Sequence, residues 1–365
     1  FISVKNNKLK VGISVGDPNG VGVEVILKTL QNKEILDFFT PVIFGSTKLL
    51  SYQKNIFGLN SMYFQGIFKP EEAIHGKINV VNLWKDNVAI EFGQPTEESA
   101  QMARSSLIAA TNALKRGAVD VLVTAPFNPE TIRNEEFNFS GHTEYLEKEL
   151  GGRPLLLLEN EKLRIATITQ NISEVSQKLT KDLIKKQIRT LHTTLIQDFY
   201  IEKPKIAVLG LHPHNAEQGL TGKEDIEIIE PAVRESFDRG ILAFGPYPAD
   251  DFFTPPQYTA FDGILTMYHD QGLLPFKSPN YEYGACFTAG LPFIHMAPNH
   301  GIEYEIAGQG VAHSGSFEQA IFDAIKIFKN RKEYLQLKSN SLQKAKIEGI
   351  DSTVDEDLPT EDIEL

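Results

Sequence analysis

The fold prediction begins with the stretch VGISVGDPNGVGVEVILKTL, residues 11–30. An apolar run at Val11–Val15 is typical of a buried strand, and a helical pattern follows at Val23–Leu30. Between them lies a glycine-rich turn at Gly16–Gly22. Glycines permit tight turning, and the start of a helix attracts anions. The turn matches neither the G-x-G-x-x-G pattern nor a Walker A loop, so a purely structural turn and a ligand-binding one both remain open.

The same alternation of short apolar runs and longer helical patterns continues along the chain. Further strands are predicted at Pro41–Phe44, Ile78–Leu83, Asp120–Thr124, Leu155–Leu158, Leu163–Thr167, Lys205–Leu209 and Gly263–Met267. Further helices are predicted at Glu97–Arg116, Glu144–Glu149, Ser173–Phe199, Asp225–Arg239 and Ser316–Asn330. Gly117 should end the first of these helices, and Ser316 should cap the last. Apolar strands separated by helices indicate an α/β fold with mostly parallel sheets covered on both faces.

Composition excludes several classes of protein. The chain has 365 residues, a formal net charge of −12 and one cysteine, Cys286, so neither an intramolecular disulfide nor a Cys-rich zinc framework can form. A reducing, cytoplasmic setting is therefore expected. The absence of a long apolar run argues against a membrane span, and the acidic balance argues against nucleic-acid binding. Residues 348–365 include many acidic residues and no Lys or Arg, which is typical of a solvated tail.

A helix start in the middle of the chain contains side chains that suit anion binding. The segment Ser140-Gly141-His142-Thr143-Glu144 precedes a predicted helix. Thr143 is a candidate N-cap, and His142 beside it can contact a phosphate or a carboxylate. A plain capping role is an equally good interpretation of this segment.

Histidines follow two other predicted strands. His212 and His214 lie two residues apart after the strand at Lys205–Leu209, and one of them is a reasonable ligand for a divalent metal. His269 follows the next strand, and Lys277 lies eight residues beyond it. This pair suits metal-assisted chemistry on an oxygen-rich substrate, in which the metal polarises a hydroxyl or carbonyl and the lysine transfers a proton. Each segment taken alone is also compatible with an ordinary surface loop.

The order of these segments resembles that of the 4-hydroxythreonine-4-phosphate dehydrogenase family of pyridoxal 5′-phosphate biosynthesis. The similarity covers about residues 10–330. Its matching segments are GDPNGVGVE (16–24), VTAPFNP (123–129), SGHTEYL (140–146), GLHPHNAEQGLTGKED (210–225), GPYPADDFF (245–253), MYHDQGLLPFK (267–277), TAGLPFI (288–294) and NHGIEYEIAGQG (299–310).

The resemblance implies a two-domain α/β/α subunit similar to isocitrate and isopropylmalate dehydrogenases. One domain would comprise residues 1–128 and 282–340, and the other residues 129–281, followed by an acidic tail at 341–365. The active site would lie in the cleft between the domains and be completed by the second subunit of a homodimer. The implied reaction is NAD(P)-dependent oxidation of the small phosphorylated substrate 4-phosphooxy-L-threonine, with decarboxylation to 3-amino-2-oxopropyl phosphate. One divalent ion (Zn, Mg, Mn or Co) would assist it.

The resemblance also implies roles for individual residues. His142 and Thr143 match substrate contacts. Lys277 matches a substrate lysine and Asp250 an acidic residue close to the metal, and both are expected to be catalytic. The pair His300-Gly301 lies in a loop that resembles the nucleotide-contacting loop of decarboxylating dehydrogenases, so these two residues are expected to bind the cofactor.

The metal and substrate positions include several departures from the family pattern. His214 and His269 match two metal ligands, whereas Asn171 stands at the third, where the family has histidine. An amide oxygen is a weaker ligand than imidazole for zinc-like ions but is acceptable for Mg²⁺. Cys286 and His295 stand at further substrate-binding positions, where asparagine and arginine are usual. A neutral imidazole cannot reproduce the bidentate grip of a guanidinium group.

Two alternatives follow from these departures. The changes at Cys286 and His295 are compatible with a dehydrogenase for another phosphorylated hydroxy acid. The changes at Asn171 and at Pro129, which stands where the family has a lysine, are compatible with a catalytically impaired relative that keeps the fold.

Overall fold

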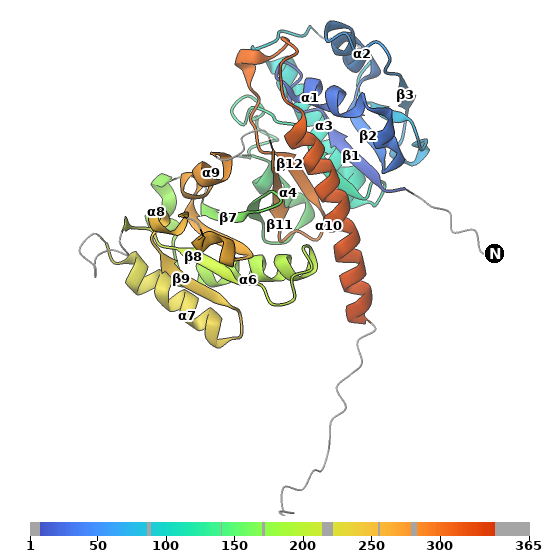
Figure 1. The fold of residues 1–365 in the computed structure, drawn as a ribbon. Helices are drawn as coiled ribbons and strands as arrows, with labels where there is room; N and C mark the ends of the chain where they lie inside the picture. Colours follow the sequence, from blue (N-terminus) through green and yellow to red (C-terminus); the bar gives the residue numbers. More distant parts are fainter. Residues whose placement is uncertain are drawn as a thin grey trace, which may run out of the picture.

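The computed structural model describes residues 8–85, 89–139, 141–169, 172–213, 222–254, 256–278 and 283–339. Twelve strands form one continuous mixed sheet in the order β3-β4-β2-β1-β5-β12-β11-β6-β7-β10-β8-β9 (Figure 1). The strands are β1 (Lys10–Ser14), β2 (Thr40–Gly45), β3 (Phe64–Ile67), β4 (Ile78–Asn82), β5 (Val121–Thr124), β6 (Leu155–Glu159), β7 (Arg164–Thr169), β8 (Ile206–Leu209), β9 (Ala243–Tyr247), β10 (Gly263–Tyr268), β11 (Ala285–Ala289) and β12 (His295–Pro298).

The sheet is parallel at both ends and antiparallel in its middle. The antiparallel pairs are β12 with β11, β11 with β6, and β6 with β7. The neighbours β7, β10, β8 and β9 are parallel to one another, as are β12, β5 and β1. Two groups of parallel strands, which appear as two lobes in Figure 1, are therefore joined by the antiparallel strands β11 and β6.

Helices cover both faces of this sheet. They are α1 (Gly22–Leu30), α2 (Thr47–Ile56), α3 (Glu97–Lys115), α4 (His142–Leu150), α5 (Val175–Lys178), α6 (Lys181–Gln197), α7 (Glu230–Asp238), α8 (Ala249–Phe252), α9 (His269–Lys277) and α10 (Gly315–Ser339). Short 3₁₀ helices lie at Lys33–Asp37, Pro70–Glu72, Ile172–Glu174, Gln257–Ala260 and Tyr304–Ile306, and a π-helical segment lies at Asp225–Ile229. None of the described helices is long and apolar enough to cross a membrane.

The apolar core has one large layer and two smaller ones. On one face, α1, α6, α7 and α10 pack on the sheet through a cluster that extends across both lobes. On the opposite face, α3 and α4 cover the first lobe, which contains β1 to β5 and β12, and α8 and α9 cover the second lobe, which contains β7 to β10. The second face is thus divided between two apolar clusters, and the central strands lie between them.

The α/β class with a mostly parallel sheet is confirmed, and eight of the strands lie where the sequence predicts them. Alternation did not reveal β3, β9, β11, β12, α2, α8 or α9. The division into domains at residues 128/129 and 281/282 stays a prediction, since the sheet is continuous through both parts.

Three local predictions were wrong. The single helix expected over Ser173–Phe199 is interrupted, because Leu179 is extended and the Thr180 side chain accepts a hydrogen bond from the Leu183 backbone at 3.2 Å to begin α6. Ser316 does not cap α10, which begins at Gly315; its hydroxyl bonds to the backbone of Gly284 and Asn299 instead. Thr143 is not the N-cap of α4 either, since that position is Gly141.

Candidate functional site

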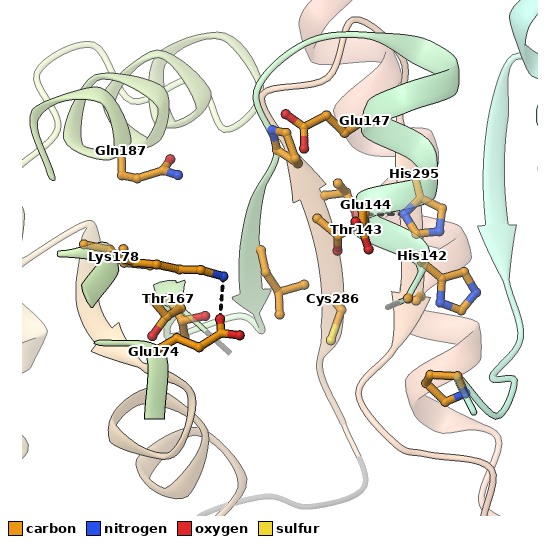
Figure 2. Close-up of a pocket in the computed structure, with 18 of the residues that line it drawn as sticks. His142, Thr143, Glu144, Glu147, Thr167, Glu174, Lys178, Gln187, Cys286 and His295 are labelled. Carbon is orange, nitrogen blue, oxygen red and sulfur yellow. Dashed lines mark hydrogen bonds and ion pairs between the residues drawn. The ribbon is translucent and has the colours of Figure 1, made fainter. Parts of the chain in front are cut away.

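A cavity of about 800 Å³ lies over the central strands, beside the start of α4. Figure 2 shows His142, Thr143 and His295 on one side of it, Glu174 and Lys178 on the other, and Cys286 on a strand between them. Four of the five predicted substrate-binding residues thus line one cavity: His142, Thr143, Cys286 and His295. The fifth, Lys277, is not among its lining residues.

His295 is held between two threonine hydroxyls. Its Nε2 lies 2.8 Å from Oγ1 of Thr124 on β5, and its Nδ1 lies 2.8 Å from Oγ1 of Thr288 on β11. His295 itself begins β12 and is 1% exposed. Burial, with His142 close by, lowers the pKa of His295 well below the usual histidine value. The residue is therefore a neutral hydrogen-bonding group at physiological pH.

His142 is stacked beside His295. The two ring centroids are 5.7 Å apart, and the ring of Phe127 lies 4.0 Å from His142 on centroid distance. The Nε2 atom of His142 is buried and has no hydrogen-bond partner among the described residues. Burial lowers the pKa of His142 to about 3. A neutral imidazole with an unpaired nitrogen in a cavity wall is suited to bind a polar ligand.

Cys286 contributes an uncharged, polarisable surface. It lies on β11 opposite Leu158 of β6 and Ala297 of β12. Burial raises the pKa of the thiol to about 12, although the positive charge of Lys277 acts in the opposite direction. Cys286 is consequently a thiol rather than a thiolate, and it is not a nucleophile at neutral pH.

Several polar lining residues were not predicted from the sequence. Thr167 and Thr169 of β7 and Thr288 of β11 face the cavity, and Glu174 and Lys178 form an ion pair on its far side. The alternation of strand residues could have placed Thr288 on the same face as Cys286, two positions away. The alternation is informative only once β11 is known to be a strand, which the local sequence pattern does not indicate.

The residues predicted around the metal follow four neighbouring strands. β7, β8, β9 and β10 are parallel, so their carboxyl ends lie at one edge of the sheet, where ligands of α/β proteins usually bind. Asp250 is exposed on α8 after β9, and His269 begins α9 after β10. Asn171 and His214, which come after β7 and β8, lie outside the described residues. The remaining histidine of the pair, His212, is bonded to Glu224 at 2.9 Å from Nε2 to Oε2.

Among the described residues at this edge, His269 has the chemistry of a ligand for a divalent ion. The Nδ1 atom of His269 lies 2.8 Å from Oδ1 of Asp270, and a carboxylate in this position commonly orients a metal-binding imidazole so that Nε2 faces the ion. Within the described parts of the chain, no three His, Cys, Asp or Glu side chains form a complete metal site.

Of the two predicted cofactor residues, His300 lines a second cavity of about 360 Å³, whereas Gly301 is not among its lining residues. His300, Glu303, Glu305 and His313 are among its lining residues. Nδ1 of His300 donates to the carbonyl of Gly301 at 2.9 Å, and its Nε2 is buried without a partner among the residues described. Burial lowers the pKa of His300. An unpaired buried nitrogen at the cavity wall fits a polar group of a bound nucleotide.

The glycine-rich turn is packed against the loop that follows His300. Gly16 has φ +64°, and a Cβ there would lie 2.2 Å from the carbonyl oxygen of Pro126. Asp17 accepts a hydrogen bond from the Tyr304 hydroxyl at 2.6 Å, and the Val21 backbone donates to the Ile302 carbonyl at 3.0 Å. These contacts favour the structural interpretation of the turn.

Comparison with known proteins gives consistent matches. The family model described as pyridoxal phosphate biosynthetic protein PdxA matches residues 37–324. A relative from Bacteroides thetaiotaomicron, named 4-hydroxythreonine-4-phosphate dehydrogenase, is 43% identical over 97% of this chain and 100% of its own. A relative from Symbiobacterium thermophilum with the provisional name D-threonate 4-phosphate dehydrogenase is 32% identical over 85% of this chain and 94% of its own.

A solved structure has the same fold. The crystal structure of 4-hydroxythreonine-4-phosphate dehydrogenase from Klebsiella pneumoniae matches with a TM-score of 0.75 and 29% identity, covering 89% of this chain and 99% of that one.

Proposed function

The chain belongs to the family of the pyridoxal phosphate biosynthetic protein PdxA, and on this basis we propose that it is the 4-hydroxythreonine-4-phosphate dehydrogenase of its pathway. The reaction is oxidation of 4-phosphooxy-L-threonine with NAD or NADP, followed by decarboxylation to 3-amino-2-oxopropyl phosphate. The observation that carries the proposal is a whole-length match to enzymes of this name combined with one cavity that contains His142, Thr143, Cys286 and His295.

The substrate cavity supplies neutral hydrogen-bonding groups. His142 and His295 are both uncharged at neutral pH because burial lowers their pKa values. Thr143 adds a hydroxyl at the first turn of α4, where the helix dipole and the free N–H groups favour a phosphate or carboxylate. Lys277 lies close enough for its positive charge to act downward on the pKa values of both Cys286 and His300, and we assign it proton transfer.

Metal and cofactor binding complete the proposal. When bound, a divalent ion would polarise the substrate oxygen and NAD(P) would accept the hydride. His269, His214 and Asn171 are the proposed metal ligands, with Asp250 nearby. We assign the dinucleotide to the cavity beside His300 and Gly301. The buried Nε2 atom of His300 and the acidic side chains of the cavity wall offer hydrogen-bonding groups to it.

The proposed assembly is a homodimer in which each site uses residues of both subunits. His269 is not among the residues that line the substrate cavity of its own chain, which favours contribution of this ligand by the other subunit. The proposed location is the cytoplasm, since a chain with one cysteine does not require an oxidising compartment.

A second candidate function is oxidation of D-threonate 4-phosphate. Relatives with this provisional name are 32% and 33% identical to this chain over 85% and 87% of its length. The two substrates differ at the carbon next to the carboxylate, where one has an amine and the other a hydroxyl. The neutral cavity wall formed by His142, Cys286 and His295 does not itself select between them.

The test is NADH formation from each substrate under matched conditions. The protein is stripped with a chelator and assayed again after addition of Mg²⁺, Mn²⁺, Co²⁺ or Zn²⁺. We expect metal-dependent turnover that is faster with 4-phosphooxy-L-threonine; faster turnover of D-threonate 4-phosphate would support the second candidate. Turnover of neither by a folded protein would overturn both and leave a catalytically impaired relative.

A second assay isolates the metal site. His269→Ala should lose bound metal, measured by equilibrium dialysis, whereas His75→Ala, at an exposed histidine of the first lobe, should retain it. Unchanged metal occupancy in His269→Ala would remove that residue from the ligand set.

A further inference from the structure

Three side chains, two of which line the cavity, form a continuous series of hydrogen bonds. Oγ1 of Thr124, the imidazole of His295 and Oγ1 of Thr288 are joined by two contacts of 2.8 Å. Because His295 is neutral, the series has three polar hydrogens, one on each hydroxyl and one on the ring. Two contacts use two hydrogens. One hydrogen is therefore left over, whichever ring nitrogen is protonated.

The surroundings decide which end of the series has the remaining hydrogen. Thr124 is 0% exposed, does not line the cavity, and has no second side-chain hydrogen bond within the described residues. An unpaired hydroxyl hydrogen there would carry the desolvation cost of a buried donor, about 1–3 kcal/mol. Thr288, in contrast, lines the cavity. The favoured arrangement has Thr124 donating to Nε2, and Nδ1–H donating to Thr288.

We propose that Thr288 is a further substrate-binding residue, whose hydroxyl donates into the cavity to an anionic oxygen of the ligand, and that Thr124 and His295 position this hydrogen. The inference rests on the proposed function for the identity of the ligand, whose phosphate and carboxylate both offer such oxygens. The family pattern has an arginine at position 295. In this protein, Thr124, His295 and Thr288 together offer a neutral donor instead, the hydroxyl of Thr288, in place of a charged guanidinium group.

The first test measures KM and kcat for 4-phosphooxy-L-threonine in hydroxyl variants. Thr288→Val should raise KM about tenfold or more, because it removes a hydrogen bond to a charged acceptor. Thr288→Ser, which keeps the hydroxyl, should restore most of the affinity. Thr124→Val should raise KM by a smaller factor, since it removes the donor that fixes the ring, and Thr124→Ser should reverse this. The matched control is Thr29→Val, because Thr29 is equally buried in α1 and its hydroxyl has no partner in the described structure.

The second test reads the ring directly. Nitrogen NMR of the ¹⁵N-histidine-labelled protein, with the His295 signals assigned by loss in His295→Gln, should show a neutral ring protonated at Nδ1. Protonation at Nε2 would overturn the proposed arrangement of Thr124, His295 and Thr288, as would an unchanged KM in Thr288→Val of an active enzyme. Absence of turnover in the unmodified protein would instead count against the proposed function, and the NMR result would still test the proposed hydrogen-bond arrangement.

Discussion

Because His295 is held uncharged, the folded protein should become less stable at low pH. The folded protein holds the ring uncharged, because its pKa lies well below 6.5, whereas the unfolded chain binds a proton at about that pH. The unfolded state therefore binds more protons as pH falls below 6.5, and stability should decrease by about 1.36 kcal/mol per pH unit for this group. Above 6.5 the contribution of this histidine is constant.

This linkage predicts the behaviour of His295→Gln. From pH 6.5 to pH 5, the unmodified protein should lose unfolding free energy through His295, at no more than about 1.36 kcal/mol per pH unit, and the variant should not have this component. Urea unfolding of both proteins at the two pH values measures the difference. His75→Gln, at an exposed histidine, controls for the substitution itself. An identical pH dependence in His295→Gln and the unmodified protein would contradict the prediction.

Gly16 shows how one backbone position connects two segments. Its φ of +64° alone should make Gly16→Ala unfavourable by about 1–2 kcal/mol, and the new Cβ would also lie 2.2 Å from the Pro126 carbonyl oxygen. Gly58→Ala is the matched control, because φ is +69° there and nothing lies within 4 Å of the added atom. Thermal unfolding should show a clearly larger loss for Gly16→Ala. Equal losses would mean that the contact with Pro126 relaxes freely.

At the scale of elements, sequence patterns identified long periodic segments and missed short or irregular ones. The helix α3 was found because its apolar stripe is long and Gly117, with φ +73°, follows its end. β12 has four residues, and α9 contains Gly272 and Pro275, both unfavourable inside a helix. These two elements provide His295 and His269, so the local signal failed at positions that we propose to be functional. The family resemblance located both residues but not the strand and helix on which they lie.

The longest helix, α10, is attached to α6 by a buried ion pair. Arg331 donates to both carboxylate oxygens of Asp198, at 2.7 Å from Nε and 2.8 Å from Nη2, and Asp198 is 0% exposed. A third bond at 3.1 Å joins Nη1 to the Leu291 carbonyl, in the segment between β11 and β12. The pair thus connects two helices with the strands that line the cavity.

Removal of one partner should be strongly destabilising. Arg331→Ala leaves the Asp198 carboxylate buried without its cation, and we expect a loss of about 3–5 kcal/mol in urea unfolding. Lys332→Ala, at the neighbouring exposed position, should change stability by less than about 0.5 kcal/mol. The double variant Asp198→Asn with Arg331→Met should recover much of the loss. A small effect of Arg331→Ala would imply that water reaches the carboxylate.

At the scale of the whole molecule, the candidate site depends on which side chains the sheet brings close together, and no sequence pattern gives those distances. His142 is far in sequence from Cys286 and His295, and the antiparallel centre of the sheet brings all three to one cavity. Their protonation states could not be predicted, because burial depends on tertiary packing, such as the stacking of His142 on His295. The role proposed for Thr288 likewise follows only from the partners of the His295 ring.

Subunit complementation tests whether the site is shared between two chains. His142→Ala and His269→Ala should each impair turnover, but a hybrid dimer with one copy of each should recover about half of full activity, because one of its two sites has neither change. Hybrids are isolated by two different affinity tags, and their mass is checked by light scattering. A hybrid of the unmodified chain with the double variant should then be inactive, because each site contains one altered residue. Sites within single chains would give the opposite pair of results, an inactive first hybrid and a half-active second one, and a purely monomeric protein would also contradict the shared site.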